Sequence, residues 1–162
     1  MASDDPLQVR LGDALRERGW TVATAESCTG GLVGHLITEV AGCSAYYAGG
    51  IVAYSNEAKE NLLGVERSTL ERHGAVSGET ALEMARGARR VLRADLAVSI
   101  TGIAGPSGGT PDKPVGTTWI AASAPGQDLA ELHVWCGDRS QNKDLSARAA
   151  LDLALRILES RP

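Results

Sequence analysis

The run "DLAVSITG" at residues 95–102 restricts the possible folds more than any other feature of the sequence. It is strongly apolar, which is typical of a strand covered on both faces of a sheet. Residues 77–94, directly before it, have the clearest helical pattern in the chain. The apolar stripe of that helix consists of Ala81, Met84, Ala85, Ala88, Val91 and Leu92. A helix leading into a buried strand predicts an α/β fold with this strand at the centre of the sheet.

Helical and strand patterns alternate in the first part of the chain, and a hairpin with a turn at Pro125 and Gly126 comes late. Strands are predicted at 20–26, 46–55, 95–102, 115–124 and 130–137, and helices at 7–19, 30–42, 56–64, 77–94 and 146–159. At the last helix, the residues spaced to face a core are Leu145, Ala149, Leu153 and Ile157. This order predicts a three-layer α/β/α sandwich over a mixed, mostly parallel sheet. We expect one domain over residues 1–162, with a core from about 7 to 158.

Composition excludes several function classes. The 162 residues carry a net charge of −4, which argues against a broad nucleic-acid footprint. The one dense basic cluster lies on the polar side of the 77–94 helix, and a solvated helix face is its favoured interpretation. That cluster consists of Arg86, Arg89, Arg90 and Arg93. No apolar run approaches the ~20 residues of a membrane span, so no membrane partner is expected.

Cysteine and histidine usage predicts reduced thiols and signals no metal site, although one built from distant residues stays open. Cys28, Cys43 and Cys136 form an odd set without paired spacing, as expected of free thiols in the cytoplasm. The histidines are far apart in sequence, and no cluster has zinc-ligand spacing. The acidic start "MASDDPLQVR" lacks the apolar region of a signal peptide. We therefore expect a cytoplasmic protein.

Three loops are expected where ligands gather in α/β sheets, beyond the carboxyl ends of the strands. They are "ESCTGG" at 26–31, "AYSNEAK" at 53–59 and "TGIAGPSGG" at 101–109. The third is rich in glycine, and such loops cradle phosphates, although a tight connection rich in turns explains the composition equally well. It matches neither a Walker loop nor the dinucleotide fingerprint.

Ser27 precedes a predicted helix, where a serine is either a helix cap or a nucleophile beside an anion-binding helix end. No GxSxG elbow surrounds it, so a serine–lysine arrangement is the economical catalytic alternative. Cys28 is a rival nucleophile, because a helix N-terminus lowers the pKa of a thiol. Backbone N–H groups from Cys28 to Gly30 are candidates to hold an oxyanion, and Gly30 and Gly31 leave space for a substrate.

Lys59 is the candidate base. If Asn56 caps the following helix, Lys59 takes its third position, where the helix dipole and partial burial disfavour the ammonium form. A neutral amine there would accept a proton from Ser27. On the loop alone, a solvated surface lysine is the more common situation, and Tyr54 is more often a core residue than a catalytic one.

Four motifs together resemble one family closely. They are "AESCTGG" (25–31), "GGIVAYSNEAK" (49–59), "GAVSGETA" (74–81) and "TGIAGPSGGTPDKPVGT" (101–117). In this order they are similar to the C-terminal domain of the competence/damage-inducible CinA proteins, the family of nicotinamide-nucleotide amidohydrolases. The resemblance runs from about Leu7 to Leu158, and the combination is far more specific than any single motif.

The resemblance implies an α/β/α sandwich, often dimeric, that hydrolyses nicotinamide mononucleotide to nicotinic acid mononucleotide and ammonia in pyridine-nucleotide salvage. It places the catalytic serine, tyrosine and lysine on Ser27, Tyr54 and Lys59, so that Lys59, directly or through Tyr54, would deprotonate Ser27. It also implies a reaction without a metal or another cofactor. The expected partners are therefore this nucleotide and a second copy of the chain. Residues expected to bind substrate are Cys28, Thr29, Gly30, Gly31, Gly50, Ser77, Thr101, Gly102, Gly105, Gly109 and Arg139.

The chain departs from the family pattern at one position. Relatives commonly carry a second arginine four residues after Arg139, where this chain has Lys143. Lysine keeps the charge but cannot grip phosphate in the bidentate manner of arginine. Two alternatives stay open: a non-catalytic nucleotide-binding module of the same fold, and an amidohydrolase acting on another small amide.

Overall fold

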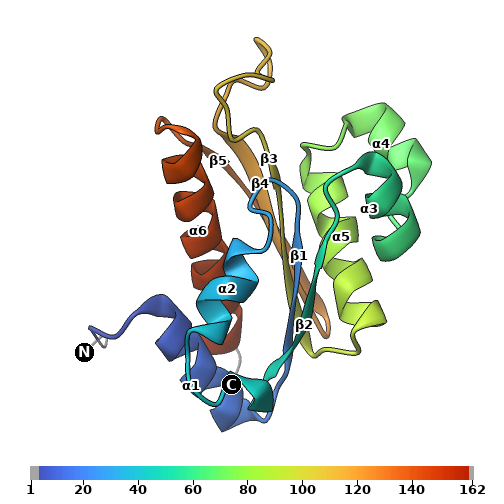
Figure 1. Ribbon diagram of the computed structural model, residues 1–162. Coiled ribbons are helices and arrows are strands. Elements are labelled where there is room, and N and C mark those ends of the chain that lie inside the picture. The colour runs from blue at the N-terminus through green and yellow to red at the C-terminus, as the bar shows by residue number, and fades with distance from the viewer. Residues whose placement is uncertain (1–3, 161–162) are drawn as a thin grey trace.

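The apolar run in the second half of the chain forms β3 (Leu96–Gly102), the central strand of a five-stranded sheet, with six of its seven residues buried. The computed structural model describes residues 4–160 and shows the sheet between two layers of helices (Figure 1). The elements before β3 are α1 (Leu7–Arg18), β1 (Val22–Glu26), α2 (Leu32–Thr38), η1 (Cys43–Ala45), β2 (Tyr47–Val52), α3 (Asn56–Leu63), α4 (Arg67–His73) and α5 (Gly78–Val91). After it come β4 (Thr117–Ala124), β5 (Gln127–Val134) and α6 (Arg139–Glu159).

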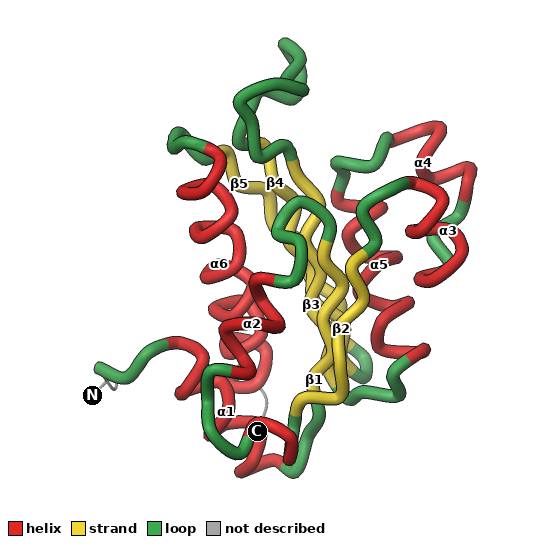
Figure 2. Tube along the Cα trace, in the orientation of Figure 1, coloured by secondary structure: helices red, strands yellow, loops and turns green. Residues whose placement is uncertain are grey.

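The sheet is mixed, as predicted, with the strand order β2-β1-β3-β4-β5. β1 pairs in parallel with both β2 and β3, whereas β4 pairs antiparallel with β3 and β5. Two reversals leave β4 as the one strand that opposes the other four. The carboxyl ends of β1, β2 and β3 consequently lie at the same edge of the sheet, and the three glycine- and serine-rich loops leave from it (Figure 2).

Each face of the sheet has its own helical layer and its own apolar core. Helices α1, α2 and α6 cover one face, and α3, α4 and α5 cover the other (Figure 1). The larger core, under the first layer, includes Leu11, Leu15, Leu151 and Ile157. The smaller one lies under α5, and Leu63 and Met84 are among its members. The three-layer sandwich predicted from the alternation of elements is therefore confirmed.

Local sequence signals explain several helix boundaries, and some of these boundaries differ from the prediction. Ser55, not Asn56, caps α3, because its hydroxyl accepts the Ala58 amide at 3.0 Å. Helix α6 begins seven residues before the predicted start, where Asp138 and Gln141 form a capping box. Helix α4 was not predicted, and the helix expected at 30–42 ends at Thr38 in favour of the short turn η1.

Two predicted core positions are wrong. Val91 is 52 % exposed, because α5 ends there and the chain turns away before β3 begins. Leu145 is 39 % exposed, since the buried stripe of α6 runs along Ala147 and Ala150 and leaves it at the rim. Residues 1–3 and 161–162 of the predicted domain lie outside the described residues. No helix within 4–160 is both long enough and apolar enough to span a bilayer.

Candidate active site

The turn from β1 into α2 carries Ser27 at the carboxyl edge of the sheet. The Ser27 side chain is buried, and its amide donates to the carbonyl of Ile100 in β3 at 3.0 Å. Gly30 and Gly31 follow with φ of 62° and 107°, a conformation that glycine adopts without strain. The turn therefore fixes the Ser27 hydroxyl at a defined point, between the end of β1 and the start of a helix.

Glu26 holds this turn together, a role that the sequence analysis missed. Its carboxylate is buried and accepts three hydrogen bonds: from the Thr29 hydroxyl at 2.7 Å, and from the amides of Val33 and Gly34 at 2.9 and 3.1 Å. A carboxylate at a helix N-terminus neutralises the free amides there. An acidic residue ending an otherwise apolar strand was the available signal. The hydroxyl of Thr29, which was predicted to bind substrate, instead donates to Glu26.

Lys59 reaches into the same place from the first turns of α3. Its ammonium nitrogen Nζ lies 3.1 Å from Ser27 Oγ, 3.0 Å from the Ala53 carbonyl and 3.1 Å from the Tyr54 carbonyl. The side chain is only 1 % exposed, and this burial lowers the pKa of the amine below its ordinary value. With Ser55 as the cap, Lys59 is the fourth helical residue rather than the third, which corrects the prediction by one position.

The three neighbours of Nζ decide where its lone pair points. The two carbonyls only accept hydrogen bonds, so they take the two N–H groups of a neutral amine. The remaining tetrahedral position of Nζ is directed at Ser27 Oγ, whose hydroxyl can donate. A neutral Lys59 is thus oriented to accept the Ser27 proton, which is the geometry that a general base requires.

Cys28 follows Ser27 but lacks the properties of a nucleophile. Burial raises the pKa of its thiol to about 11, despite the opposing effects of its own amide and of Lys59 and Arg139. The expectation that the helix N-terminus would activate this thiol is therefore wrong here, because desolvation outweighs it. The side chain packs into the larger core.

Backbone amides beside Ser27 are placed to receive a developing negative charge. Within residues 4–160, the amides of Cys28 and Thr29 donate to no acceptor in another residue, and that of Cys28 interacts with its own thiol. The Gly30 amide, also predicted for this role, instead donates to the Ser27 carbonyl at 3.1 Å. Two adjacent N–H groups without a partner in another residue, next to a candidate nucleophile, form the kind of arrangement that stabilises an oxyanion.

Tyr54 and Arg139 form the outer part of the site. The Tyr54 ring is 61 % exposed, and its hydroxyl lies 3.4 Å from Nη2 of Arg139, the first residue of α6. Arg139 also donates through Nη1 to the Gly105 carbonyl at 2.8 Å. Lys59 meets only the backbone carbonyl of Tyr54, so the phenol does not lie between Lys59 and Ser27. Lys143 follows Arg139 one helical turn later on α6.

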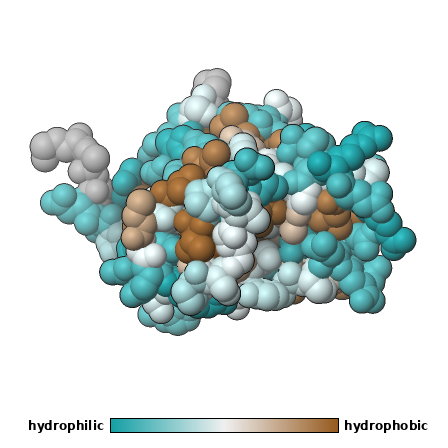
Figure 3. Space-filling model, turned by 90° about the horizontal axis from the view of Figure 1, so that it is seen from above, coloured by the Kyte–Doolittle hydropathy of each residue, from teal (hydrophilic) through white to brown (hydrophobic). Residues whose placement is uncertain are grey.

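The loop at 103–116 stands above the sheet near the start of α6 (Figure 2). Asn142 of α6 donates to the Ala104 carbonyl at 3.0 Å and anchors the base of this loop, a contact not anticipated from the sequence. A pocket of about 500 Å³ opens between the loop and the start of α6. Its lining consists of Ala104, Pro106, Val115, Gly137, Asp138, Arg139 and Ser140. Seen from above, this edge mixes hydrophobic and hydrophilic side chains (Figure 3).

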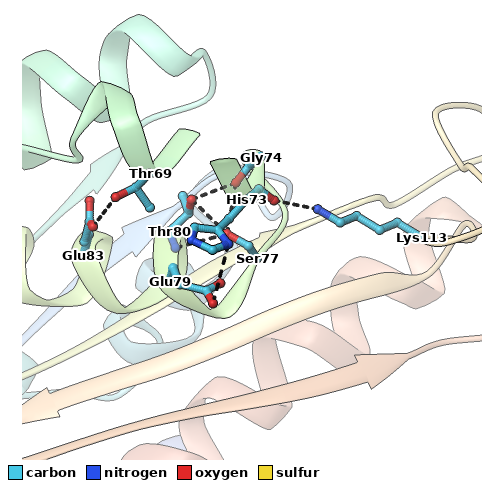
Figure 4. Close-up of polar contacts among 8 residues, drawn as sticks. All are labelled: Thr69, His73, Gly74, Ser77, Glu79, Thr80, Glu83 and Lys113. Carbon is cyan, nitrogen blue, oxygen red and sulfur yellow. Dashed lines mark hydrogen bonds and ion pairs between the residues drawn. The ribbon is translucent and has the colours of Figure 1, made fainter. Parts of the chain in front are cut away.

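Other predicted substrate-binding residues make contacts within the protein. The Ser77 hydroxyl caps α5 by accepting the Thr80 amide, and it lies 3.0 Å from the Gly74 carbonyl (Figure 4). The Thr101 hydroxyl donates to the Ala75 carbonyl at 2.7 Å.

Three predicted glycines serve close packing. A Cβ at Gly50 would collide with the hydroxyls of Thr24 and Tyr47, one at Gly102 with Thr118, and one at Gly109 with the backbone of Val115.

Lys113 connects the 103–116 loop to the end of α4, because its ammonium group donates to the His73 carbonyl at 2.8 Å (Figure 4). Among the described residues, no group of three or more His, Cys, Asp or Glu side chains is arranged to hold a metal ion.

Comparison with known proteins places the chain in a family. Residues 4–158 match the family described as the CinA C-terminal domain. A CinA-like protein of Salinibacter ruber is 52 % identical over 96 % of this chain, which spans only 38 % of that relative. The nicotinamide-nucleotide amidohydrolase PncC of Escherichia coli is 51 % identical over 94 % of this chain and 90 % of its own length. A CinA superfamily protein from Klebsiella pneumoniae has the same fold, with a TM-score of 0.92, 37 % identity and coverage of 96 % and 97 % of the two chains.

Proposed function

The chain belongs to the CinA C-terminal domain family, and on that premise we propose that it hydrolyses the carboxamide of nicotinamide mononucleotide. The products are nicotinic acid mononucleotide and ammonia. One observation carries the proposal: the buried Lys59 amine lies 3.1 Å from the Ser27 hydroxyl, with both of its other contacts made to carbonyls. The amidohydrolase name of a relative that matches this chain over most of both lengths supports the choice of substrate.

Acylation begins with proton transfer from Ser27 to the neutral Lys59. Ser27 Oγ forms a bond to the carboxamide carbon, and the carbonyl oxygen takes the negative charge. The amides of Cys28 and Thr29 donate to that oxygen. As the C–N bond breaks, the proton held by Lys59 passes to the leaving nitrogen. Ammonia departs and Ser27 is left as a nicotinoyl ester.

Deacylation repeats the same proton movements with water as the nucleophile. Lys59, neutral again, takes a proton from a water molecule that attacks the ester carbon. The bond to Ser27 Oγ breaks, and Lys59 returns the proton to the departing serine oxygen. The carboxylate product then leaves. No step requires a metal ion or a redox partner, since each one transfers only protons and an acyl group.

The substrate phosphate needs a cation outside the reacting centre. Arg139 supplies one, because it lies at the pocket between the 103–116 loop and α6 and already touches Tyr54. Its planar guanidinium matches the geometry of phosphate oxygens. Lys143, one helical turn away, adds a second positive charge in the position where relatives commonly carry arginine.

Ammonia release from nicotinamide mononucleotide tests the proposal. The purified protein is incubated with EDTA and substrate, beside Ser27→Ala and a matched control, Ser68→Ala, whose exposed hydroxyl donates to Glu66. We expect wild type and Ser68→Ala to release ammonia equally, and Ser27→Ala to lose about 10³-fold or more while still binding the nucleotide. A Ser27→Ala variant as active as wild type would overturn the mechanism. Folded wild type without turnover would overturn the assigned reaction, and release from simpler pyridine amides instead would reassign the substrate.

A further inference from the structure

We propose that a second pocket, at the edge of the sheet opposite Ser27, binds a small anion that carries two or more phosphate groups. This pocket has a volume of about 310 Å³. It is lined by Arg86, Arg89, Arg90, Arg93, Ala94 and Ser123. The proposal is independent of the amidohydrolase activity, because neither Ser27 nor Arg139 contributes to the pocket.

The position of this arginine pocket follows from the topology. Ala94 lies between the end of α5 and the start of β3, at the end of the sheet away from the loops (Figure 1). Ser123 of β4 pairs with Ala97 near the beginning of β3, and so lies at the same edge. Ser27 follows the last residue of β1, whose partner in β3 is Ile100. The length of α5 therefore separates the two pockets.

The charges around the arginine pocket are only partly neutralised. Arg86 pairs with Asp128 at 2.7 Å, and Arg90 donates to the Leu63 carbonyl at 3.1 Å. Within residues 4–160, neither Arg89 nor Arg93 has a carboxylate partner. Three guanidinium charges without a counter-charge thus face one small concavity, in a chain whose net charge is −4. Like charges this close repel, and a bound anion removes that repulsion.

The backbone of Arg93 supplies an independent observation. Its φ is 51°, and no other non-glycine residue in the described part of the chain has a positive φ. Helices commonly end with glycine in this conformation, because a Cβ is unfavourable there. The amide of Ala94 closes the helix end on the Arg89 carbonyl at 3.0 Å, which a glycine at 93 would permit with less strain. Arginine thus occupies a position where glycine is less strained, which is consistent with a use for the Arg93 side chain.

Attraction to the helix dipole does not explain the whole cluster. Arg89 and Arg90 in the last turn of α5 do complement the negative end of the dipole. Arg93 lies beyond the helix, however, and its strained backbone is not required for that interaction. From the sequence alone, the four arginines were interpreted as a solvated helix face. The structure shows in addition that Ser123 of β4 and the α5–β3 turn lie beside them and complete a concave surface.

The chemistry and size of the arginine pocket select its ligand. Guanidinium groups bind phosphate oxygens in a bidentate fashion, and three uncompensated ones exceed what a single phosphate neutralises. The volume is near the lower end of the range of about 300–1,000 Å³ that is usual for small-molecule sites. The positive surface is confined to one helix end, whereas a nucleic acid would need a longer basic stripe.

Calorimetric titration with inorganic pyrophosphate at low ionic strength tests the proposal. We expect saturable binding to wild type that weakens as salt is added. The double variant Arg89→Ala/Arg93→Ala should lose at least about tenfold in affinity. A charge-matched control, Arg72→Ala/Arg148→Ala, should keep wild-type affinity. Absence of saturable pyrophosphate binding, or equal affinity in the Arg89/Arg93 variant, would each overturn the proposal.

Arg93→Gly separates ligand binding from structure. Glycine accepts the backbone conformation at 93, so the melting temperature should stay equal to wild type or rise. Pyrophosphate affinity should nevertheless fall severalfold. A lower melting temperature with unchanged affinity would show that Arg93 is retained for stability, and would contradict the proposal.

Discussion

The two side-chain pairs at the carboxyl edge of the sheet differ in burial and in closeness. Ser27 and Lys59 are 8 % and 1 % exposed and lie 3.1 Å apart, held by β1, β3 and α3. Tyr54 is 61 % exposed, and its hydroxyl lies 3.4 Å from Arg139 across two loops. Under the proposed mechanism, the difference teaches that this fold positions its proton-transfer groups before substrate arrives and leaves the groups that contact substrate exposed to solvent. Each prediction below changes one side of this comparison.

The largest effect is expected from removing the buried base. Lys59→Met replaces the amine by an apolar side chain of similar length, and activity should fall by about 10²–10⁴-fold, the usual contribution of a general base. The free energy of unfolding should change by less than about 2 kcal/mol. Two carbonyls lose a donor in this variant, but the desolvation of a buried amine is relieved. Ammonia release and denaturant unfolding measure both effects. Activity above a tenth of wild type would contradict the role of Lys59 as the general base.

The pH dependence of the same variant sharpens the test. Because burial lowers the pKa of Lys59, the wild-type kcat/KM should rise with pH up to that pKa and then level off. Between the lowered pKa and the ordinary value of 10.5, the unfolded chain binds more protons than the folded chain. Wild-type stability should therefore rise with pH in this window, by at most about 1.4 kcal/mol per pH unit. Lys59→Met should show neither the rise of kcat/KM with pH nor this rise of stability with pH.

Removing the exposed cation should affect binding rather than chemistry. Arg139→Ala deletes the guanidinium expected to hold the substrate phosphate, and KM should rise by about 10- to 100-fold with little change in kcat. Arg139→Lys should recover part of the loss, because it restores the charge without the bidentate geometry. Steady-state kinetics on nicotinamide mononucleotide distinguishes these parameters. A fall in kcat with unchanged KM would place Arg139 in the chemical step instead.

A smaller effect is expected at Tyr54. Lys59 contacts the backbone carbonyl of this residue, so Tyr54→Phe keeps that contact and loses only the long hydrogen bond to Arg139. KM should rise by less than about tenfold, and kcat should stay near wild type. If kcat instead falls as far as in Lys59→Met, the phenol takes part in proton transfer. The separation of a catalytic pair, Ser27 and Lys59, from a substrate-binding pair, Tyr54 and Arg139, would then be wrong.

The smallest effect is expected at Cys28. Burial raises the pKa of its thiol to about 11, so the side chain is uncharged near neutral pH and serves packing. Cys28→Ala should keep activity within about threefold and lower the free energy of unfolding by about 1 kcal/mol. Thermal unfolding and ammonia release measure both quantities. Loss of activity matching that of Ser27→Ala would identify the thiol as the nucleophile.

The sequence predicted the layers and the central strand because apolar periodicity reports burial directly. It placed Val91 and Leu145 in the core wrongly, since the rim of a buried stripe depends on what the neighbouring layer covers. The capping signals of Ser55 and Asp138 were present in the sequence, but neighbouring residues also fitted a cap or a turn.

The candidate site likewise has a part that could be predicted from the sequence and a part that could not. Ser27 and Lys59 were predicted as a pair, and the structure places them in contact. The supporting role of Glu26 depends on two amides of a helix that begins five residues after Ser27, and a single sequence does not reveal it. Gly50 and Ser77 fall within motifs shared with relatives, yet their contacts here are internal. A motif therefore does not show whether each of its residues contacts substrate or only packs within the protein.

A double-mutant cycle on Ser27 and Lys59 tests the central claim most directly. Ammonia release is measured for wild type, Ser27→Ala, Lys59→Met and the double variant under the same conditions. If the two side chains act as one unit, each single variant loses nearly the full rate enhancement and the double variant loses no more. Losses that multiply in the double variant would mean that Ser27 and Lys59 act independently, and would contradict the account.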